Sequence, residues 1–216
     1  MTAVAIDHVA EGRLQQLGLS ADLLIRALLR ADAEAKMTTG LEPPTAEGTT
    51  RYAKTVRYVR EELVPLGWKP DNAKNFCRTI HPSGSFSIVT SSGDEFTGVH
   101  VPGMKPSTKY AKGDLTTMAV KQNADQGVLD LGEAYALRTL DPADLENVWL
   151  LLQRVTAETI YAELSLPTSI EKGVIVDWEE RILLPHISRQ DPPSTVAIEE
   201  PPSEDGDAYN VEVALR

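Results

Sequence analysis

The hydrophobic period of the sequence changes near residue 70, and this change constrains the fold more than any other feature. In the first 64 residues, apolar side chains recur at spacings of three, four and seven, the pattern of helices that pack one face on a core. From residue 75 onward, short runs rich in β-branched and aromatic residues follow one another, as in strands. Helices followed by strands predict an α+β fold, in which N-terminal helices pack on a mainly antiparallel sheet.

The first predicted helix spans residues 14–37. Its apolar face is formed by Leu14, Leu17, Leu24, Leu28 and Ala31. Gly18 interrupts the run, and Ser20 is a good N-cap because its hydroxyl can accept a hydrogen bond from the first turn. The helix is therefore expected to be most regular over 21–37.

A second helix is predicted over residues 50–64, after a loop that holds two prolines and two glycines. Pro65 and Gly67 end this helix, since proline cannot continue it and glycine accepts the conformation of a C-terminal cap. Its apolar stripe is expected to consist of Tyr52, Val56, Val59 and Leu63.

Three short runs at 75–80, 85–90 and 96–101 predict a three-stranded antiparallel meander over residues 75–101. The first connection, 81–84 (HPSG), has proline in its second position and glycine in its fourth, as type I turns prefer. The second connection has the usual length of a hairpin loop.

The acids Asp94 and Glu95 would lie at the tip of the second hairpin of this meander. Adjacent side chains on a strand diverge, so these acids are interpreted as polar turn residues and not as a catalytic pair. The expected register pairs Ile80 with Ser85 and Thr90 with Phe96.

A later hairpin is predicted from the apolar runs at 148–155 and 160–166. The first run is almost continuously apolar, which indicates a strand buried on both faces. Residues 174–184 (VIVDWEERILL) fit a strand or a helix, and the spacing of their larger apolar residues favours a helix from residue 176 onward.

Residues 1–188 are expected to form a single domain, and residues 189–216 an acidic, proline-rich flexible tail. A loop is predicted at 102–113, and Asp114 would cap a short helix over 115–122. The sequence leaves open whether the meander and the later hairpin join one sheet. If they do not, residues 123–147 would link two small subdomains.

A cytoplasmic protein without membrane association is expected. The single cysteine, Cys77, excludes an internal disulfide framework and is typical of a reducing compartment. The N-terminus lacks the basic region of a signal peptide. The apolar runs are far shorter than the roughly 20 residues of a membrane helix.

The charge is distributed unevenly along the chain. Residues 51–121 hold 11 Lys and Arg against 6 Asp and Glu, whereas the whole chain has a net charge of −11. Basic side chains with neighbouring hydroxyl groups can bind phosphates. The candidate residues for binding a nucleic acid or another anion are Arg51, Lys54, Arg57, Arg60, Lys105, Lys109 and Lys112. Alternatively, neighbouring acids neutralise these cations.

Motifs for catalysis and for bound groups are absent from the sequence. It has no phosphate-binding glycine motif, no G-x-S-x-G and no C-x-x-C or H-E-x-x-H. Cys77, His81, His100, Asp94 and Glu95 are residue types that can bind a metal, but they lack a recognised ligand spacing. The sequence therefore predicts no catalytic residue, no metal and no cofactor.

These features predict a non-enzymatic intracellular binding or regulatory protein that acts through a protein partner. Two alternatives remain open. One is a nucleic-acid-binding accessory protein that uses the 51–60 helix and the 105–121 segment. The other is a hydrolase or transferase with a site near His100. The sequence does not indicate an oligomeric state.

Overall fold

Residues 2–126 and 147–190 are described by the structure, which is a computed structural model. Their elements are, in chain order, β1 (Ala3–Ala5), α1 (Asp7–Gln16), α2 (Ala21–Ala35), α3 (Ala46–Leu63), the 3₁₀ helix η1 (Val64–Leu66), β2 (Lys69–Asp71), the 3₁₀ helix η2 (Ala73–Asn75), β3 (Arg78–Ile80), β4 (Phe86–Ser92), α4 (Asp114–Gln126), β5 (Asn147–Val155), β6 (Thr159–Glu171), β7 (Val174–Leu183) and β8 (Ile187–Ser188). The α+β prediction is confirmed.

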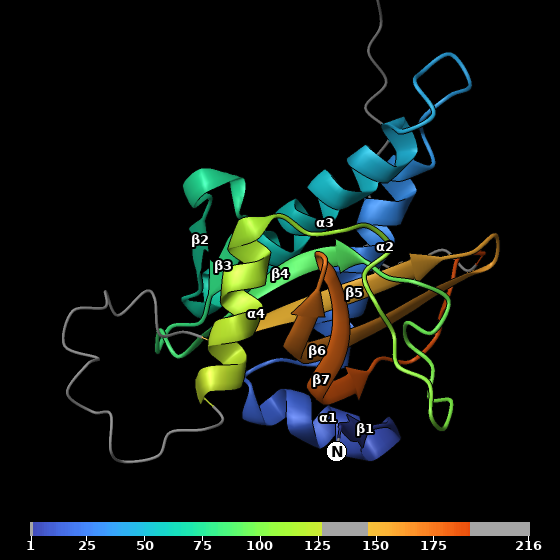
Figure 1. Cartoon of the computed structure of the whole chain (residues 1–216). Helices are drawn as coiled ribbons and strands as arrows, with labels where there is room; N and C mark the ends of the chain where they lie inside the picture. The colour runs from blue at the N-terminus through green and yellow to red at the C-terminus, as the bar shows by residue number, and fades with distance from the viewer. Residues whose placement is uncertain (1, 127–146, 191–216) are drawn as a thin grey trace, which may run out of the picture.

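The described strands form one sheet of eight strands in the order β1-β7-β6-β5-β4-β3-β2, with β8 paired to β6. The sheet is mostly antiparallel, but β1 pairs parallel with β7 and β4 pairs parallel with β5. Helices α1, α2 and α3 pack on one face, here called the helix face. Helix α4 and the loop of residues 93–113 cover the other, here called the loop face (Figure 1).

The region predicted as one helix over 14–37 contains two. Helix α1 ends at Gln16, and Gly18 adopts a left-handed φ of 69°, which turns the chain before α2. The Ser20 hydroxyl accepts a hydrogen bond of 3.3 Å from the Leu23 amide, so the predicted N-cap is confirmed. All five predicted face residues are buried in the core of the helix face.

Helix α3 ends where expected, next to Pro65 and before Gly67, whose φ is 90°. Its predicted stripe is partly wrong, because Tyr52 is 41% exposed. The buried residues of α3 are Thr55, Tyr58, Val59 and Leu63. The two polar members can be buried because each is hydrogen-bonded: Thr55 to Gln153 at 2.9 Å and Tyr58 to Glu34.

The predicted meander exists with different members. Its three antiparallel strands are β2, β3 and β4, and the predicted strand over 96–101 is wrong. Residues 96–101 form turns and loop because Gly98 has a φ of 72° and because β4 already pairs with β5 on that side. The expected register is also wrong, since Ile80 pairs with Ser87 and not with Ser85.

The later hairpin is confirmed as β5 and β6, and β5 is the buried central strand that its composition predicts. The preference for a helix after residue 176 is wrong, because the segment is strand β7. Lys172 and Gly173 both have left-handed φ values, 49° and 80°, which suits the two-residue turn that reverses β6 into β7.

Both hairpins belong to one sheet, joined by the parallel pair of β4 and β5. Helix α4, which contains the predicted 115–122 helix, lies between these strands in sequence and packs against β5 and β6. The proposed linker over 123–147 falls largely outside the described residues, as does most of the predicted tail.

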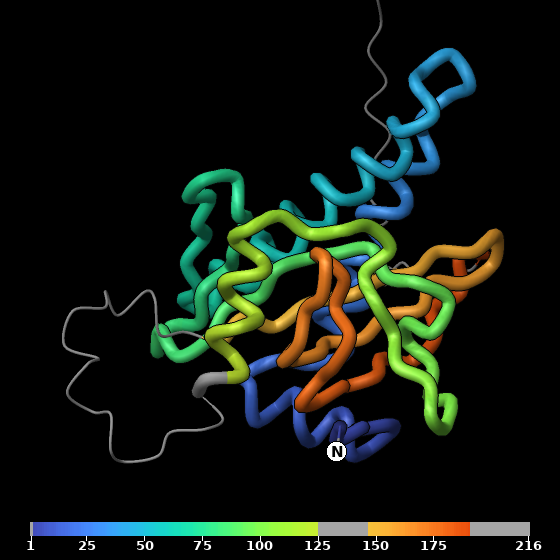
Figure 2. Tube along the Cα trace, viewed as in Figure 1, coloured from blue at the N-terminus to red at the C-terminus, as the bar shows by residue number. Residues whose placement is uncertain are grey.

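The 93–113 loop runs across the loop face and is attached to it along its length (Figure 2). Hydrogen bonds join Gly93 N to Gln153 O at 2.9 Å and Lys112 N to Gly173 O at 2.7 Å. Between these ends, the indole of Trp178 donates to Pro106 O at 2.8 Å. The loop is therefore an ordered third layer of the fold.

No helix among the described residues combines the length and the apolar character needed to cross a membrane.

Candidate functional site

The predicted cations on α3 are mostly paired with carboxylates. Arg51 contacts buried Asp32 at 3.1 Å and Glu47 at 2.5 Å. Lys54 pairs with Glu34, and Arg57 pairs with Glu61 at 2.7 Å. Three of the four α3 cations therefore have their charge balanced within the protein, as the alternative reading of the sequence expected.

Arg60 differs from these three because its hydrogen-bond partners among the described residues are oxygens without a negative charge. Its Nη2 donates to Asp71 O at 2.8 Å, to Arg78 O at 2.9 Å and to the Asn72 side chain at 2.9 Å. The guanidinium thus ties α3 to the end of β2 and the start of β3, and it adds positive charge at the outer face of α3.

The loop lysines lie on the opposite layer. Lys105 pairs with Asp177 at 2.6 Å, and Lys109 lies 5.5 Å from the ring of Tyr110. Burial lowers the pKa of Lys112. These residues belong to the loop face, whereas α3 packs on the helix face, so the structure does not gather the two predicted basic groups on one surface.

The two acids of the supposed hairpin tip lie at the start of the 93–113 loop. Asp94 accepts hydrogen bonds from the amides of Phe96 (3.1 Å) and Ser107 (2.8 Å), and so it shapes the loop. Burial raises the pKa of Asp94, although these amides oppose the effect. Glu95 is exposed. The tip assignment is wrong, but neither acid contacts an imidazole within the described part of the chain.

The histidines occupy two separate places. His81 stacks on Phe86 with ring centres 4.7 Å apart, and burial lowers its pKa. His100 lines a cavity of about 540 Å³ together with Asp7 and His186. His186 faces Gly98 O at 3.3 Å. In the ranges 2–126 and 147–190, no group of three His, Cys, Asp or Glu is arranged to hold a metal ion.

A buried ion pair on the loop face was not predicted from the sequence. Glu163 and Arg181 are charged residues at inward positions of β6 and β7, and their contacts hold residues 96–99. A glutamate inside the apolar run 160–166 is the signal that could have indicated it.

The outer side of α3 and η1 carries an open apolar groove of about 560 Å³. Its lining residues are Ala53, Val56, Arg57, Arg60, Glu61, Val64 and Pro65. Val64, which lines the groove, and Leu66, two residues further along η1, are 45% and 55% exposed. We call this groove, with Leu66, the α3–η1 face.

Charges surround the α3–η1 face in a network that continues onto α2. Arg30 contacts Glu61 at 2.7 Å, and Arg26 contacts Glu62 at 2.6 Å. The charge of Asp22 also acts on Arg26 and that of Glu34 acts on Arg57, so the charges of this network nearly balance. The groove itself is lined by Arg57 and Arg60 against Glu61, so it is slightly positive although the chain as a whole is strongly acidic.

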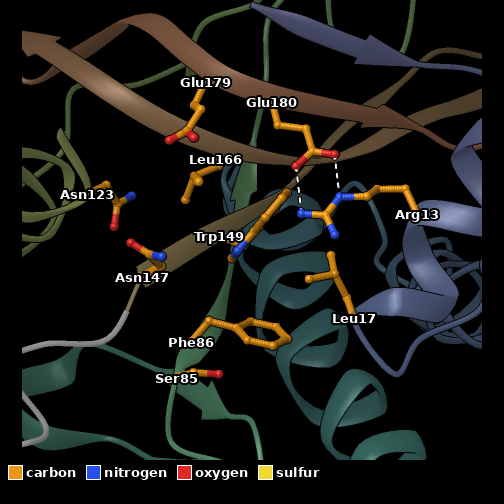
Figure 3. Close-up of a pocket in the computed structure, with 10 residues that line it drawn as sticks. All are labelled: Arg13, Leu17, Ser85, Phe86, Asn123, Asn147, Trp149, Leu166, Glu179 and Glu180. Carbon is orange, nitrogen blue, oxygen red and sulfur yellow. Dashed lines mark hydrogen bonds and ion pairs between the residues drawn. The ribbon is translucent and has the colours of Figure 1, made fainter. Parts of the chain in front are cut away.

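A third and more polar pocket, of about 290 Å³, lies at the end of the sheet where β4 and β5 begin (Figure 3). It is lined by Arg13, Leu17, Ser85, Phe86, Asn123, Asn147, Trp149, Leu166, Glu179 and Glu180. Arg13 and Glu180 form a bidentate pair at 2.6 and 3.0 Å.

Comparisons with protein-family models, with curated proteins and with solved structures find no match to this chain.

Proposed function

We propose that the protein is a non-enzymatic binding or regulatory protein, and that its α3–η1 face receives an acidic, amphipathic segment of a protein partner. The observation that carries this proposal is the open apolar groove on the outer side of α3, whose lining includes two arginines and one glutamate.

The apolar part of the proposal is supported by exposure. Val64 and Leu66 leave about half of their surface in water next to the partly buried Val56. Exposed apolar side chains that cluster and are rimmed by polar residues are typical of interaction sites. A helix or extended segment of a partner can place apolar side chains into such a groove.

The acidic character of the partner is inferred from charge complementarity. Opposite charges across an interface favour the encounter and select the partner. The groove is lined by two arginines and one glutamate, and the hydrogen-bond partners of Arg60 among the described residues are uncharged oxygens, so an acidic segment fits better than a basic one.

Nucleic-acid binding by the 51–60 helix and the 105–121 segment stays a second prediction. Phosphate binding relies on protein cations that can replace the counterions of the nucleic acid, and Arg51, Lys54 and Arg57 already pair with carboxylates. The two segments also lie on different layers of the fold, so they do not form one continuous surface.

Hydrolysis or group transfer near His100 stays a third prediction. The cavity beside it contains a second imidazole, His186, and the carboxylate of Asp7. Among the described residues, no hydroxyl, thiol or carboxylate is hydrogen-bonded to either imidazole, although an activated nucleophile needs such a base.

The proposal can be tested by affinity capture from cells that naturally contain the protein, with and without nuclease treatment. Wild type is compared with Val64→Asp, which places a charge in the groove, and with Val176→Asp, a matched control on β7 where Val176 is 39% exposed. We expect wild type and Val176→Asp to capture the same partner protein with and without nuclease. We expect Val64→Asp not to capture it.

A captured protein supports the proposal only if its contacting segment is acidic and amphipathic. Photo-crosslinking from residue 64, followed by mass spectrometry, identifies that segment. A partner captured equally by both variants, a basic contacting segment, or capture abolished by nuclease would each contradict the proposal.

A further inference from the structure

The pocket where β4 and β5 begin shares no lining residue with the α3–η1 face, and it has the composition of a small-molecule site. Its volume of about 290 Å³ lies at the lower end of the range of small-molecule pockets, which is roughly 300–1,000 Å³. Leu17, Phe86 and Leu166 give it apolar walls.

The walls of the pocket are fixed by the fold. Asn123 on α4 donates to Val148 O at 3.0 Å and to Pro167 O at 2.9 Å, and it accepts from Val148 N at 2.9 Å. Phe86 packs edge-to-face against Trp68, with ring centres 5.3 Å apart. A ligand would therefore meet a preformed site, which lowers the entropic cost of binding.

Trp149 provides an unused hydrogen-bond donor in this pocket. Its side chain is almost fully buried, with 3% of the residue exposed, and its indole nitrogen has no hydrogen-bond partner among the described residues. Figure 3 shows the indole nitrogen directed toward the side of the pocket that holds Asn147. This nitrogen opens onto the pocket, so it can donate a hydrogen bond to an acceptor group of a bound ligand.

Glu179 provides an unbalanced negative charge. The Arg13 guanidinium is paired with Glu180 through two hydrogen bonds, so these two charges cancel. Glu179 has no ion-pair or hydrogen-bond partner in the described part of the chain, and its carboxylate lies beside the pocket (Figure 3). The pocket is consequently suited to a cation.

From these contacts we infer that the pocket binds a small organic cation, namely a protonated amine on an apolar body that also carries a hydrogen-bond acceptor. The amine lies by Glu179, the body lies against Leu17, Phe86 and Leu166, and the acceptor faces Trp149 Nε1.

The inference is tested with three compounds of nearly the same shape: tyramine (cationic), tyrosol (neutral) and 4-hydroxyphenylacetate (anionic). Binding is followed by NMR through the indole Nε1–H signals of the full chain. Trp178 serves as an internal reference, because its indole already donates to Pro106 O. The Trp149 signal is assigned with Trp149→Phe, or through bond connectivities if that variant does not fold.

We expect tyramine to shift the Trp149 signal to saturation, tyrosol to bind more weakly and 4-hydroxyphenylacetate to bind most weakly. Glu179→Gln should weaken tyramine binding about three- to fivefold, because Glu179 is exposed to solvent. Glu171→Gln, at the far end of β6, should not change it. A stationary Trp149 signal, equal binding of the anion, or unchanged affinity in Glu179→Gln would overturn the inference.

Discussion

Glu163 and Arg181 form an ion pair between β6 and β7 that is shielded from solvent on the loop face. Arg181 Nη2 lies 2.5 Å from Glu163 Oε2, and the two side chains are 2% and 0% exposed. Glu163 Oε2 also accepts from Gly98 N at 2.9 Å, and Arg181 donates to Val99 O at 3.0 Å. The pair therefore joins the sheet to the 93–113 loop.

Replacing one member of this pair should be costly, because the other charge would stay buried without compensation. Glu163→Gln is expected to lower the free energy of unfolding by about 3 kcal/mol. Urea denaturation measures this value. Glu171→Gln, an exposed position of the same strand, should change it by no more than about 0.5 kcal/mol. Equal effects of the two substitutions would contradict the structural role of the pair.

Gly98 should tolerate no side chain. Its φ is 72°, and an added Cβ would lie 2.7 Å from Ala162 N, a backbone atom that cannot move independently of β6. We expect Gly98→Ala to cost about 2 kcal/mol or more of stability.

Gly103 is the matched control for this prediction, since it has a φ of 78° but nothing within 4 Å of an added Cβ. Gly103→Ala should lower the free energy of unfolding by about 1 kcal/mol, because it adds only the cost of a left-handed φ in alanine. The comparison is made by thermal and urea unfolding. If Gly98→Ala were no more destabilising than Gly103→Ala, the close approach of the loop to β6 would be refuted.

Asp32 should make stability depend on pH. Burial alone would raise the pKa of this carboxyl, but hydrogen bonds from Arg189 and Lys36 and the charge of Arg51 outweigh burial and lower it. Arg189 Nε donates to Asp32 Oδ2 at 2.9 Å and so ties residues after β8 to α2. Because the folded state then binds a proton less readily than the unfolded chain, this stabilisation is present above the unfolded pKa and is lost as the pH falls below about 4.

The prediction is checked by measuring unfolding of wild type and Asp32→Asn from pH 7 to pH 3. The difference should be about 2–4 kcal/mol at pH 7 and should shrink below pH 4. Other acids with lowered pKa, such as Asp71 and Asp177, are common to both proteins and cancel in the comparison. A difference that stays constant over the whole range would show that Asp32 is not held as a carboxylate by its partners.

Local signals in the sequence were enough for several elements. Ser20 caps the N-terminus of α2, Pro65 and Gly67 follow the end of α3, and the apolar runs of β5 and β6 predict their hairpin. In these cases the contacts that determine the element lie within a few residues or within one helix turn. Residue propensity and the hydrophobic period are therefore enough to predict where the element lies.

Other elements depend on partners far along the chain. The apolar residues of Val174–Leu183 fit both the helical and the strand period, and only the pairing of this segment with β6 and β1 makes it a strand. The turn at Lys172 and Gly173 was the local signal that could have decided this. Strand β4 pairs with β5, about 60 residues later, so its neighbours could not be deduced from adjacent turns.

The candidate sites were harder to predict than the fold. Arg51 and Lys54 are neutralised by Asp32 and Glu34, which lie on a different helix, so their pairing follows from how α2 packs on α3. The groove beside Val64 depends on the orientation of α3, and the predicted stripe with Tyr52 inside was wrong for that reason.

The central claim is that the α3–η1 face binds an acidic, amphipathic segment, and calorimetric titration of that segment tests it most directly. The segment identified by crosslinking is titrated into wild type, Val64→Asp and Val176→Asp. We predict that Val64→Asp weakens binding at least about tenfold, whereas Val176→Asp binds as wild type does. Equal affinity of all three proteins would contradict the claim.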